Sequence, residues 1–462
     1  MSYEPVIGLE IHVQLATRTK MFCGCELSFG EEPNTRCCPT CLGLPGALPV
    51  TNADAIHYGL MIGMALGSQI APKSVFHRKN YFYPDSPKAY QISQYDEPLN
   101  LGGQLGDVRI HRVHLEEDAA KLVHVGASGR IHGSDASVVD FNRCGTPLVE
   151  IVTEPDVRSA EQAREWLQLL RVTLRQLGVS DVNMEEGSLR CDANVSIRPA
   201  GTSELGTKTE LKNMNSFRFI ERGINAEIAR QTAILEGGGE IEQETLHFDP
   251  RTERITSLRS KEEAHDYRYF PEPDLVPIAI TDAMLTRARG AMPELPAARA
   301  QRLEATGLSA DHAQLLAFRP ELGAAFEAAL AEGAPAAPTA NWLANEEAAV
   351  QVQPAALAAL VSMVEAREAS RDAGLQVLAK LAAEGGDPRA IVESEGLGAI
   401  GGGDELAPIV AAALEANPDV AEKLRGGDMK PVGVIVGHVM KETRGRADGK
   451  EVTRLVREQL GL

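Results

Sequence analysis

The chain has 462 residues and a formal net charge of −19, with 44% hydrophobic and 24% charged residues. This length allows two or three domains with a large core, and the composition is that of a globular protein. The acidic excess argues against a general nucleic-acid binder, because phosphate repels such a surface. No apolar run is as long as a membrane span and no secretion signal begins the chain, so we expect a cytoplasmic protein without membrane contact.

Residues 1–293 predict one unit that mixes strands and helices. The strand-like runs are Val6–Leu15, Val108–Leu115, Leu148–Val152 and Asn194–Ile197. Helical patterns lie between these runs without regular alternation, which favours an α+β fold over a doubly wound sheet. The clearest helical pattern is Ser159–Leu177, with Ser159 as its cap and Gly178 as its stop. One face of that helix is apolar: Ala163, Trp166, Leu167, Leu170, Leu174 and Leu177.

Glu10 and His12 lie two residues apart in the first strand-like run, so both side chains point to one face. Acidic residues recur later in the chain, at Glu116, Glu117, Glu150, Asp192 and Glu210. Several carboxylates with one imidazole suit magnesium or manganese better than zinc. An ordinary structural His–Glu pair is the alternative interpretation of Glu10 and His12.

Five of the seven cysteines lie between positions 23 and 41, in a chain without a secretion signal, where disulfides are rare. Cys23 and Cys25 form one close pair, and Cys38 and Cys41 form another. Four thiolates in two short pairs suit a closed, structural zinc site. Cys37 could replace Cys38, and reduced buried thiols are the alternative to zinc.

The run Arg78–Gln94 combines cations, amides and aromatic rings, and prolines at 84 and 87 stiffen its backbone. A surface for a nucleotide needs this mixture, because cations bind phosphate and rings stack on bases. A solvated loop with a few buried tyrosines is the alternative. Phosphoryl transfer combines such groups with carboxylates that hold a metal ion. The candidate substrate- and nucleotide-binding residues are Arg78, Lys79, Asn80, Lys88, Gln91, Arg143, Arg190, Lys208, Lys212, Asn213 and Asn215.

Beyond Pro293 and Pro296 the chain is rich in alanine, leucine and glutamate with helical spacing. Glycines at 401–403 divide this part, so we expect a helical domain at 294–405 and a small C-terminal domain at 406–462. Residues 294–420 carry 7 Lys and Arg against 19 Asp and Glu, a net of −12; residues 421–462 carry 9 against 6, a net of +3. This change predicts RNA contacts in the tail, at Lys430, Lys441, Arg444, Arg446 and Lys450, although general acidity for solubility explains the charge about as well.

Eight motifs follow one another along the chain: 7–15, 78–94, 114–118, 140–143, 147–152, 184–194, 212–217 and 266–274. Together they resemble the B subunit of the aspartyl/glutamyl-tRNA(Asn/Gln) amidotransferase. The resemblance runs from residue 6 to the C-terminus in the family's order. It implies a catalytic cradle domain at 1–293 followed by an all-α region that binds tRNA.

The resemblance implies that ATP phosphorylates the side-chain carboxylate of Glu on tRNA(Gln) or Asp on tRNA(Asn), and that ammonia then displaces the phosphate. It implies a magnesium site at Glu10, His12, Glu117 and Glu150, and less clearly at Asp192 and Glu210. The implied partners are the amidase of the complex (its A subunit), which supplies ammonia, a small C subunit, misacylated tRNA and a non-discriminating aminoacyl-tRNA synthetase.

The chain has no Gly-x-Ser-x-Gly elbow and no phosphate-binding GxxxxGK[ST] loop, so it shows no glutaminase nucleophile and no standard ATP loop. A zinc-containing tRNA-binding scaffold without its own chemistry is an alternative, although it leaves the pooled carboxylates unexplained. The archaeal paralogue is another, but the chain has no room for its synthetase-like insertion after Pro273.

Overall fold

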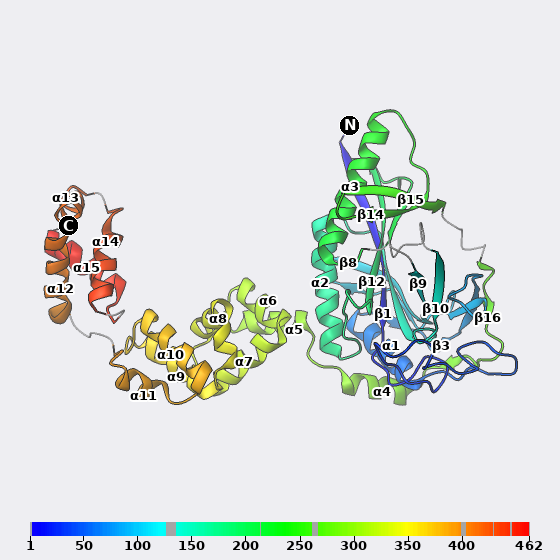
Figure 1. Cartoon of the computed structure of the whole chain (residues 1–462), viewed down its shortest axis with the longest axis horizontal. Helices are drawn as coiled ribbons and strands as arrows, with labels where there is room; N and C mark the ends of the chain where they lie inside the picture. The colour runs from blue at the N-terminus through cyan, green and yellow to red at the C-terminus, as the bar shows by residue number, and fades with distance from the viewer. Residues whose placement is uncertain are drawn as a thin grey trace. The chain divides into compact units, whose positions relative to one another are not determined.

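The computed structural model describes residues 2–125, 135–212, 214–260, 267–398, 403–427, 429–443 and 446–461. The chain divides into two compact units, Met1–Leu295 and Pro296–Leu462, and Figure 1 draws both. The first unit mixes strands and helices, and the described part of the second is helical. The predicted α+β class is therefore confirmed.

The first unit is built on a large sheet with the order β15-β14-β13-β12-β1-β11-β8-β6-β2, and β7 pairs with β8. Neighbouring strands run antiparallel, except for the parallel pair β13–β14. The strands are β1 (Tyr3–Gln14), β2 (Gln69–Ile70), β6 (Asn100–Leu101), β7 (Gln104–Leu105), β8 (Val108–Glu117), β11 (Pro147–Thr153), β12 (Leu189–Pro199), β13 (Thr209–Lys212), β14 (Glu244–Asp249) and β15 (Arg254–Ser260). All four predicted strand segments belong to this sheet.

The two faces of the central strand β1 differ in polarity. Leu9, Ile11 and Val13 are fully buried, whereas Glu10 and His12 between them are partly exposed. Since side chains alternate across a strand, the apolar residues face one layer and the polar residues face the opposite side. The polar side of the sheet is where the candidate site lies.

In the described part of the first unit, four α-helices accompany the sheet: α1 (Ala53–Ala65), α2 (Ala160–Leu177), α3 (Phe217–Glu236) and α4 (Asp282–Ala291). Helices α2 and α3 lie side by side along one side of the sheet in Figure 1. The predicted helix is α2, and all six residues of its predicted apolar face are buried. Ser159 caps α2 by accepting a hydrogen bond from the backbone of Gln162, and Gly178 ends it with a left-handed φ of 70°.

Three small sheets complete the first unit: β3 (Lys73–Ser74) with β17 (Ile278–Ala279), β16 (Phe270–Pro271) with β4 (His77–Asn80) and β5 (Tyr90–Ser93), and β9 (Lys121–Val125) with β10 (Ala136–Asp140). Arg78 pairs with Phe270 across β4 and β16. This pairing joins the motif at 78–94 to the motif at 266–274, which is nearly 190 residues later in the chain.

The described helices of the second unit are α5 (Pro296–Ala305), α6 (Ala310–Phe318), α7 (Pro320–Ala331), α8 (Ala336–Asn345), η2 (Glu347–Gln351), α9 (Pro354–Glu365), α10 (Arg371–Glu384), α11 (Pro388–Ser394), α12 (Gly403–Ala416), α13 (Pro418–Arg425), α14 (Val432–Glu442) and α15 (Gly449–Leu460). One hydrophobic cluster includes Phe326 and Trp342, and a separate one includes Val410 and Leu455. The division into domains at 294–405 and 406–462 stays a prediction. Among the described residues, no helix combines the length and the apolar character that crossing a membrane requires.

Candidate active site and metal centre

The register of the large sheet places four polar residues in one row across neighbouring strands. Arg190 on β12 pairs with His12 on β1, His12 pairs with Glu150 on β11, and Glu150 pairs with His114 on β8. Residues opposite one another in a sheet project to the same face. The row therefore brings together residues that are up to 178 positions apart in the chain.

Two members of this row, His12 and Glu150, form what we call the carboxylate cluster together with Glu116, which lies two residues after His114 on β8. The His12 Nε2 atom lies 3.6 Å from Glu116 Oε1 and 3.7 Å from Glu150 Oε2. One donor atom from each residue lies within 4.8 Å of the other two. Two carboxylates and an imidazole at this spacing fit a hard divalent cation such as Mg²⁺ or Mn²⁺, whose remaining positions water or phosphate oxygens would fill.

His114 supports both carboxylates from within the sheet. It is buried, and its Nε2 atom lies 3.2 Å from Glu150 Oε2 and 3.7 Å from Glu116 Oε2. Burial alone would lower the pKa of His114, but the two carboxylates raise it to about 9. Burial alone would raise the pKa of Glu150, but His114 and His12 hold it well below its usual value. Both acids are therefore ionised at neutral pH.

The other two predicted magnesium ligands have different partners. Glu117 forms an ion pair with Lys88 and accepts a hydrogen bond of 3.0 Å from the backbone of Ile92. Glu10 accepts a hydrogen bond of 2.9 Å from Asn194 Nδ2. Within the described residues, the carboxylate cluster thus contains Glu116 in the place expected for Glu117. The physical reason is strand alternation, which puts Glu116 on the same face of β8 as His114.

A cavity of about 360 Å³ lies against the carboxylate cluster, and we call it the reaction cavity. Its wall contains carboxylates, cations and aromatic rings, including His12, Lys79, Asp85, Lys88, Gln91, Glu116, Glu117, Asp118, Arg190, Asp192, Lys212 and Tyr267. Burial alone would lower the pKa of Lys79, but Tyr269, Glu116 and Glu150 raise it. Lys79 therefore stays charged beside the carboxylate cluster. Such a mixture of fixed charges can hold a triphosphate and an acidic acceptor together.

Five of the predicted binding residues line this cavity: Lys79, Lys88, Gln91, Arg190 and Lys212. Arg190 Nη2 lies 2.8 Å from Asp118 Oδ2, and Lys212 Nζ lies 2.8 Å from Asp192 Oδ2. The carboxylate of Glu210 lies 3.3 Å from Lys212 and accepts a hydrogen bond from Thr245. Asp192 and Glu210 are therefore held by Lys212 in this structure.

Other predicted binding residues hold the protein itself together. Arg78 makes two hydrogen bonds to the buried Glu272, at 2.7 and 2.8 Å, so it locks β4 to the segment after β16. Asn80 donates to the backbone oxygens of Tyr267 and Arg268, and Arg143 donates to those of residues 119 and 120. The remaining three predicted binding residues are Lys208 and Asn215, which are exposed, and Asn213, which lies outside the described residues.

Sequence reasoning missed three contributors to the site: His114, Asp118 and Tyr269. His114 supports Glu150, Asp118 holds Arg190, and Tyr269 stacks on Tyr95 with ring centroids 4.3 Å apart. The sequence did contain a signal for His114: it lies in the predicted strand Val108–Leu115, two residues before Glu116, so both side chains point to one face. The same spacing rule had grouped Glu10 with His12.

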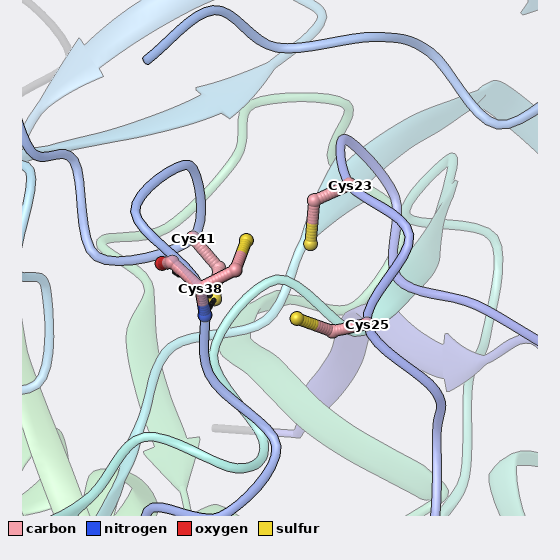
Figure 2. A group of neighbouring side chains, drawn as sticks. All are labelled: Cys23, Cys25, Cys38 and Cys41. Carbon is pink, nitrogen blue, oxygen red and sulfur yellow. Dashed lines mark hydrogen bonds between the residues drawn. The ribbon is translucent and has the colours of Figure 1, made fainter. Parts of the chain in front are cut away.

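Cys23, Cys25, Cys38 and Cys41 form a four-cysteine cluster from two loops that face each other (Figure 2). Their sulfur atoms lie within 4.8 Å of one another. A tetrahedral zinc ion with bonds of about 2.3 Å sets its sulfur ligands about 3.8 Å apart, so a small contraction would close the site. The backbone N–H of Cys38 donates to Cys41 Sγ at 3.1 Å, and Lys20 Nζ lies 3.7 Å from the same sulfur.

Cys37 has a different environment from its neighbour Cys38. Its sulfur lies 3.9 Å from Asn142 Oδ1, outside the four-cysteine cluster. The buried Cys144 donates to the backbone oxygen of Cys41 at 3.4 Å, and Cys191 is buried on β12; neither sulfur belongs to the cluster. Among the described residues, the cluster therefore contains Cys38 and not Cys37, and zinc binding by Cys38 stays a prediction.

The predicted tRNA contacts of the tail have mixed environments. Lys430, Lys441 and Lys450 are exposed, as RNA contacts need to be. Arg446 is half-buried and donates a hydrogen bond of 3.1 Å to the backbone oxygen of Thr443. Arg444 lies outside the described residues.

Comparison with known families defines the class of protein to which this fold and this site belong. Residues 5–286 match the model of the GatB/GatE catalytic domain, and residues 324–460 match the model of the GatB domain. These two matches cover most of the chain, so the chain belongs to the GatB family.

The relatives with high sequence identity share one name. A protein of Frankia casuarinae, named as the B subunit of the aspartyl/glutamyl-tRNA(Asn/Gln) amidotransferase, is 49% identical over 100% of this chain and 96% of its own length. Proteins of Moorella thermoacetica and Persephonella marina with the same name are 48% and 45% identical, each over 100% of both chains. The family predicted from the motifs is confirmed.

Proposed function

We propose that this chain is the component of a tRNA-dependent amidotransferase that binds misacylated tRNA and catalyses both reaction steps in the reaction cavity. The γ-phosphoryl group of ATP passes to the side-chain carboxylate of the esterified Glu or Asp, which gives an acyl phosphate and ADP. Ammonia then attacks the acyl carbon, and phosphate leaves. The first step is needed because a carboxylate resists attack by ammonia, whereas an acyl phosphate has a good leaving group.

The observation that carries this proposal is the carboxylate cluster beside a cationic cavity wall. His12, Glu116 and Glu150 are the residues that would hold a divalent ion, which would neutralise phosphate charge when bound. Lys79 and Lys212 supply fixed positive charge for the phosphate oxygens of ATP and the acceptor. The chain itself needs no nucleophile, because positioning and charge neutralisation are sufficient for phosphoryl transfer.

A second cavity of about 130 Å³ supports the proposed delivery of ammonia from an amidase partner. It shares Lys88, Tyr90 and Glu117 with the wall of the reaction cavity, and its lining also includes Cys23 and Cys41 of the four-cysteine cluster. An acyl phosphate is hydrolysed when water reaches it, so an internal route for ammonia is chemically useful. Zinc in the four-cysteine cluster would have all four positions filled and would act structurally.

Two partners and one substrate follow from this proposal: the amidase, a small protein that joins the two large ones, and misacylated tRNA. A non-discriminating synthetase would supply that tRNA. We further propose that the cell's complement of synthetases decides whether Glu-tRNA(Gln), Asp-tRNA(Asn) or both are used.

The test is tRNA-dependent release of phosphate from ATP by the assembled heterotrimeric complex. We expect phosphate release with at least one of the two misacylated tRNAs, and much less with the same tRNA uncharged. Formation of the amide should then need glutamine or added ammonia. A complex that binds misacylated tRNA tightly but releases no phosphate would instead identify a scaffold without chemistry.

A further inference from the structure

The carboxylates of the reaction cavity differ in whether the protein already neutralises them. Asp192 pairs with Lys212 at 2.8 Å, and Glu117 pairs with Lys88. Asp118 accepts from Gln14 and Arg190 through Oδ2 and from the next backbone N–H through Oδ1. Glu116 belongs to the carboxylate cluster and accepts from Ser93. These four groups are therefore occupied by cations, by hydrogen bonds or by the proposed metal ion.

Asp85 is the exception among the carboxylates that line this cavity. Within the described residues, its buried Oδ1 atom has no hydrogen-bond partner. Burial raises the pKa of Asp85, and a hydrogen bond from its own backbone N–H together with the positive charge of Arg143 only partly offsets this effect. A buried carboxylate oxygen without a donor is costly, and a bound cation would remove that cost.

The position of Asp85 is well defined by its backbone. The backbone oxygen of Asp85 accepts a hydrogen bond of 2.9 Å from the N–H of Ala120, and the N–H of Ser86 donates to the oxygen of Tyr83 at 2.9 Å. The carboxyl group can still rotate about its terminal bond and present either oxygen to the cavity. The backbone thus holds Asp85 on the cavity wall, and its carboxyl group can turn to meet a ligand.

The proposed substrate carries one positive charge that takes no part in either reaction step, the α-ammonium group of its amino acid. The amino acid on a misacylated tRNA is esterified through its α-carboxyl group, so its α-ammonium group is free. Building on the proposed function, we propose that Asp85 binds this α-ammonium group and thereby restricts the site to unblocked aminoacyl esters. Its neighbours Asp118 and Arg190 belong to the same wall and hold each other. Because Asp118 is already paired with Arg190, Asp85 is the acceptor that remains for the α-ammonium group.

The test compares two substrates and two enzymes in the assembled complex. The substrates are the misacylated tRNA that the wild-type complex phosphorylates, and the same tRNA esterified with the matching 2-hydroxy diacid, in which a hydroxyl replaces the ammonium group. The enzymes are the wild type and Asp85→Asn. The measurement is kcat/KM for tRNA-dependent phosphate release from ATP.

We expect the hydroxy analogue to lower kcat/KM of the wild type by about 10- to 100-fold, as the removal of a charge-assisted hydrogen bond does. Asp85→Asn should lose a similar factor on the natural substrate and lose little more on the analogue, because both changes remove the same interaction. Asp135→Asn removes an exposed carboxylate that is not on the cavity wall, so it should match the wild type on both substrates.

Two results would overturn this assignment. One is a wild type that uses both substrates equally well. The other is a loss of kcat/KM for Asp85→Asn with the hydroxy analogue that equals the product of the two separate losses. The first does not depend on any variant, so it decides the matter even where Asp85→Asn fails to assemble. Asp85→Ser offers a second variant of smaller volume. Absence of phosphate release by the wild type with the natural substrate would contradict the proposed function instead, and the two failures are therefore distinguishable.

Discussion

At the scale of single residues, neighbouring acids have different partners in this structure. Glu116 faces His12 and His114, whereas Glu117 faces Lys88 and the smaller cavity. The difference arises because consecutive side chains of a strand point to opposite faces. The properties of each acid then follow from its neighbours: histidines surround Glu116, and a lysine neutralises Glu117.

Glu150→Ala should lower tRNA-dependent phosphate release from ATP by about 100-fold or more, because a metal ligand is removed at the centre of the cluster. Glutamine hydrolysis by the amidase partner should remain largely intact. Glu154→Gln, which changes a half-exposed acid on the same segment, serves as the control. Near-normal phosphorylation by the Glu150 variant would refute the metal assignment.

Exchanging one adjacent acid at a time separates the two tasks. Glu116→Gln should raise the Mg²⁺ concentration needed for half-maximal phosphate release by about 10-fold or more, because one ionised ligand is removed. Glu117→Gln should leave that Mg²⁺ requirement within about twofold, and should slow amide formation from glutamine through its effect on Lys88. A Mg²⁺ titration of both variants measures this. A larger Mg²⁺ requirement in Glu117→Gln than in Glu116→Gln would instead identify Glu117 as the ligand.

At the scale of elements, two loops cooperate to build the four-cysteine cluster. The first carries Cys23 and Cys25, and the second carries Cys38 and Cys41 (Figure 2). Neither loop has regular secondary structure around its cysteines, so a bound ion would supply the cross-link that hydrogen-bonded strands supply elsewhere. Cys23 and Cys41 of the cluster also line the smaller cavity. A bound ion that orders the two loops would therefore also order the wall of the proposed ammonia route.

Purified protein should contain about one equivalent of zinc, as a closed four-ligand site implies. Cys38→Ser combined with Cys41→Ser should lose that zinc and lower the melting temperature by about 5 °C or more. Cys37→Ser is a closely matched control and should keep the metal, because its sulfur faces Asn142. Metal analysis by mass spectrometry decides the point, and unchanged zinc in the double variant would contradict the assignment.

At the scale of the whole molecule, we propose that chemistry and RNA binding belong to different parts of the chain. The reaction cavity lies in the first unit, whereas the basic segment 421–462 lies at the end of the second. An acidic protein that binds tRNA benefits from this separation, since the attraction stays local and acidic surfaces repel RNA elsewhere. The exposed Lys430, Lys441 and Lys450 are the clearest candidates for that local attraction.

Truncation of the chain at Gly403 within the complex should weaken tRNA binding by about 10-fold. It should also make the slope of log K against log salt concentration shallower, by about 0.7 to 0.9 for each phosphate that is no longer neutralised. The triple change of Lys430, Lys441 and Lys450 to Gln should act in the same direction without removing the fold. Lys121→Gln, which removes one exposed lysine from the first unit, is the control for loss of a surface charge outside the tail. Unchanged affinity across a salt series would show that the tail only packs.

The isolated chain should form no amide from glutamine, because its sequence offers no recognisable glutaminase nucleophile. With high added ammonia it should amidate misacylated tRNA weakly, and addition of the amidase should confer dependence on glutamine. Measurement of amidated aminoacyl-tRNA under these three conditions tests the division of labour. Amide formation from glutamine by the chain alone, free of contaminating amidase, would overturn it.

The sequence alone determined the features that depend on local pattern and on long motifs. The strands and the face of helix α2 follow from apolar periodicity, and the family follows from motifs that are individually long. The cysteine spacing likewise predicted a four-cysteine cluster, because both members of each pair lie on one short loop.

Only the tertiary structure decided which distant residues meet. Strand order and register bring His12, Glu150 and His114 into one row, and no local pattern encodes that register. The same register decides that Glu116 rather than Glu117 joins the carboxylate cluster. It is also the folded cavity that distinguishes Asp85 from its neighbours, because neutralisation of a carboxylate depends on which cations pack against it, and Lys212, Lys88 and Arg190 come from distant parts of the chain.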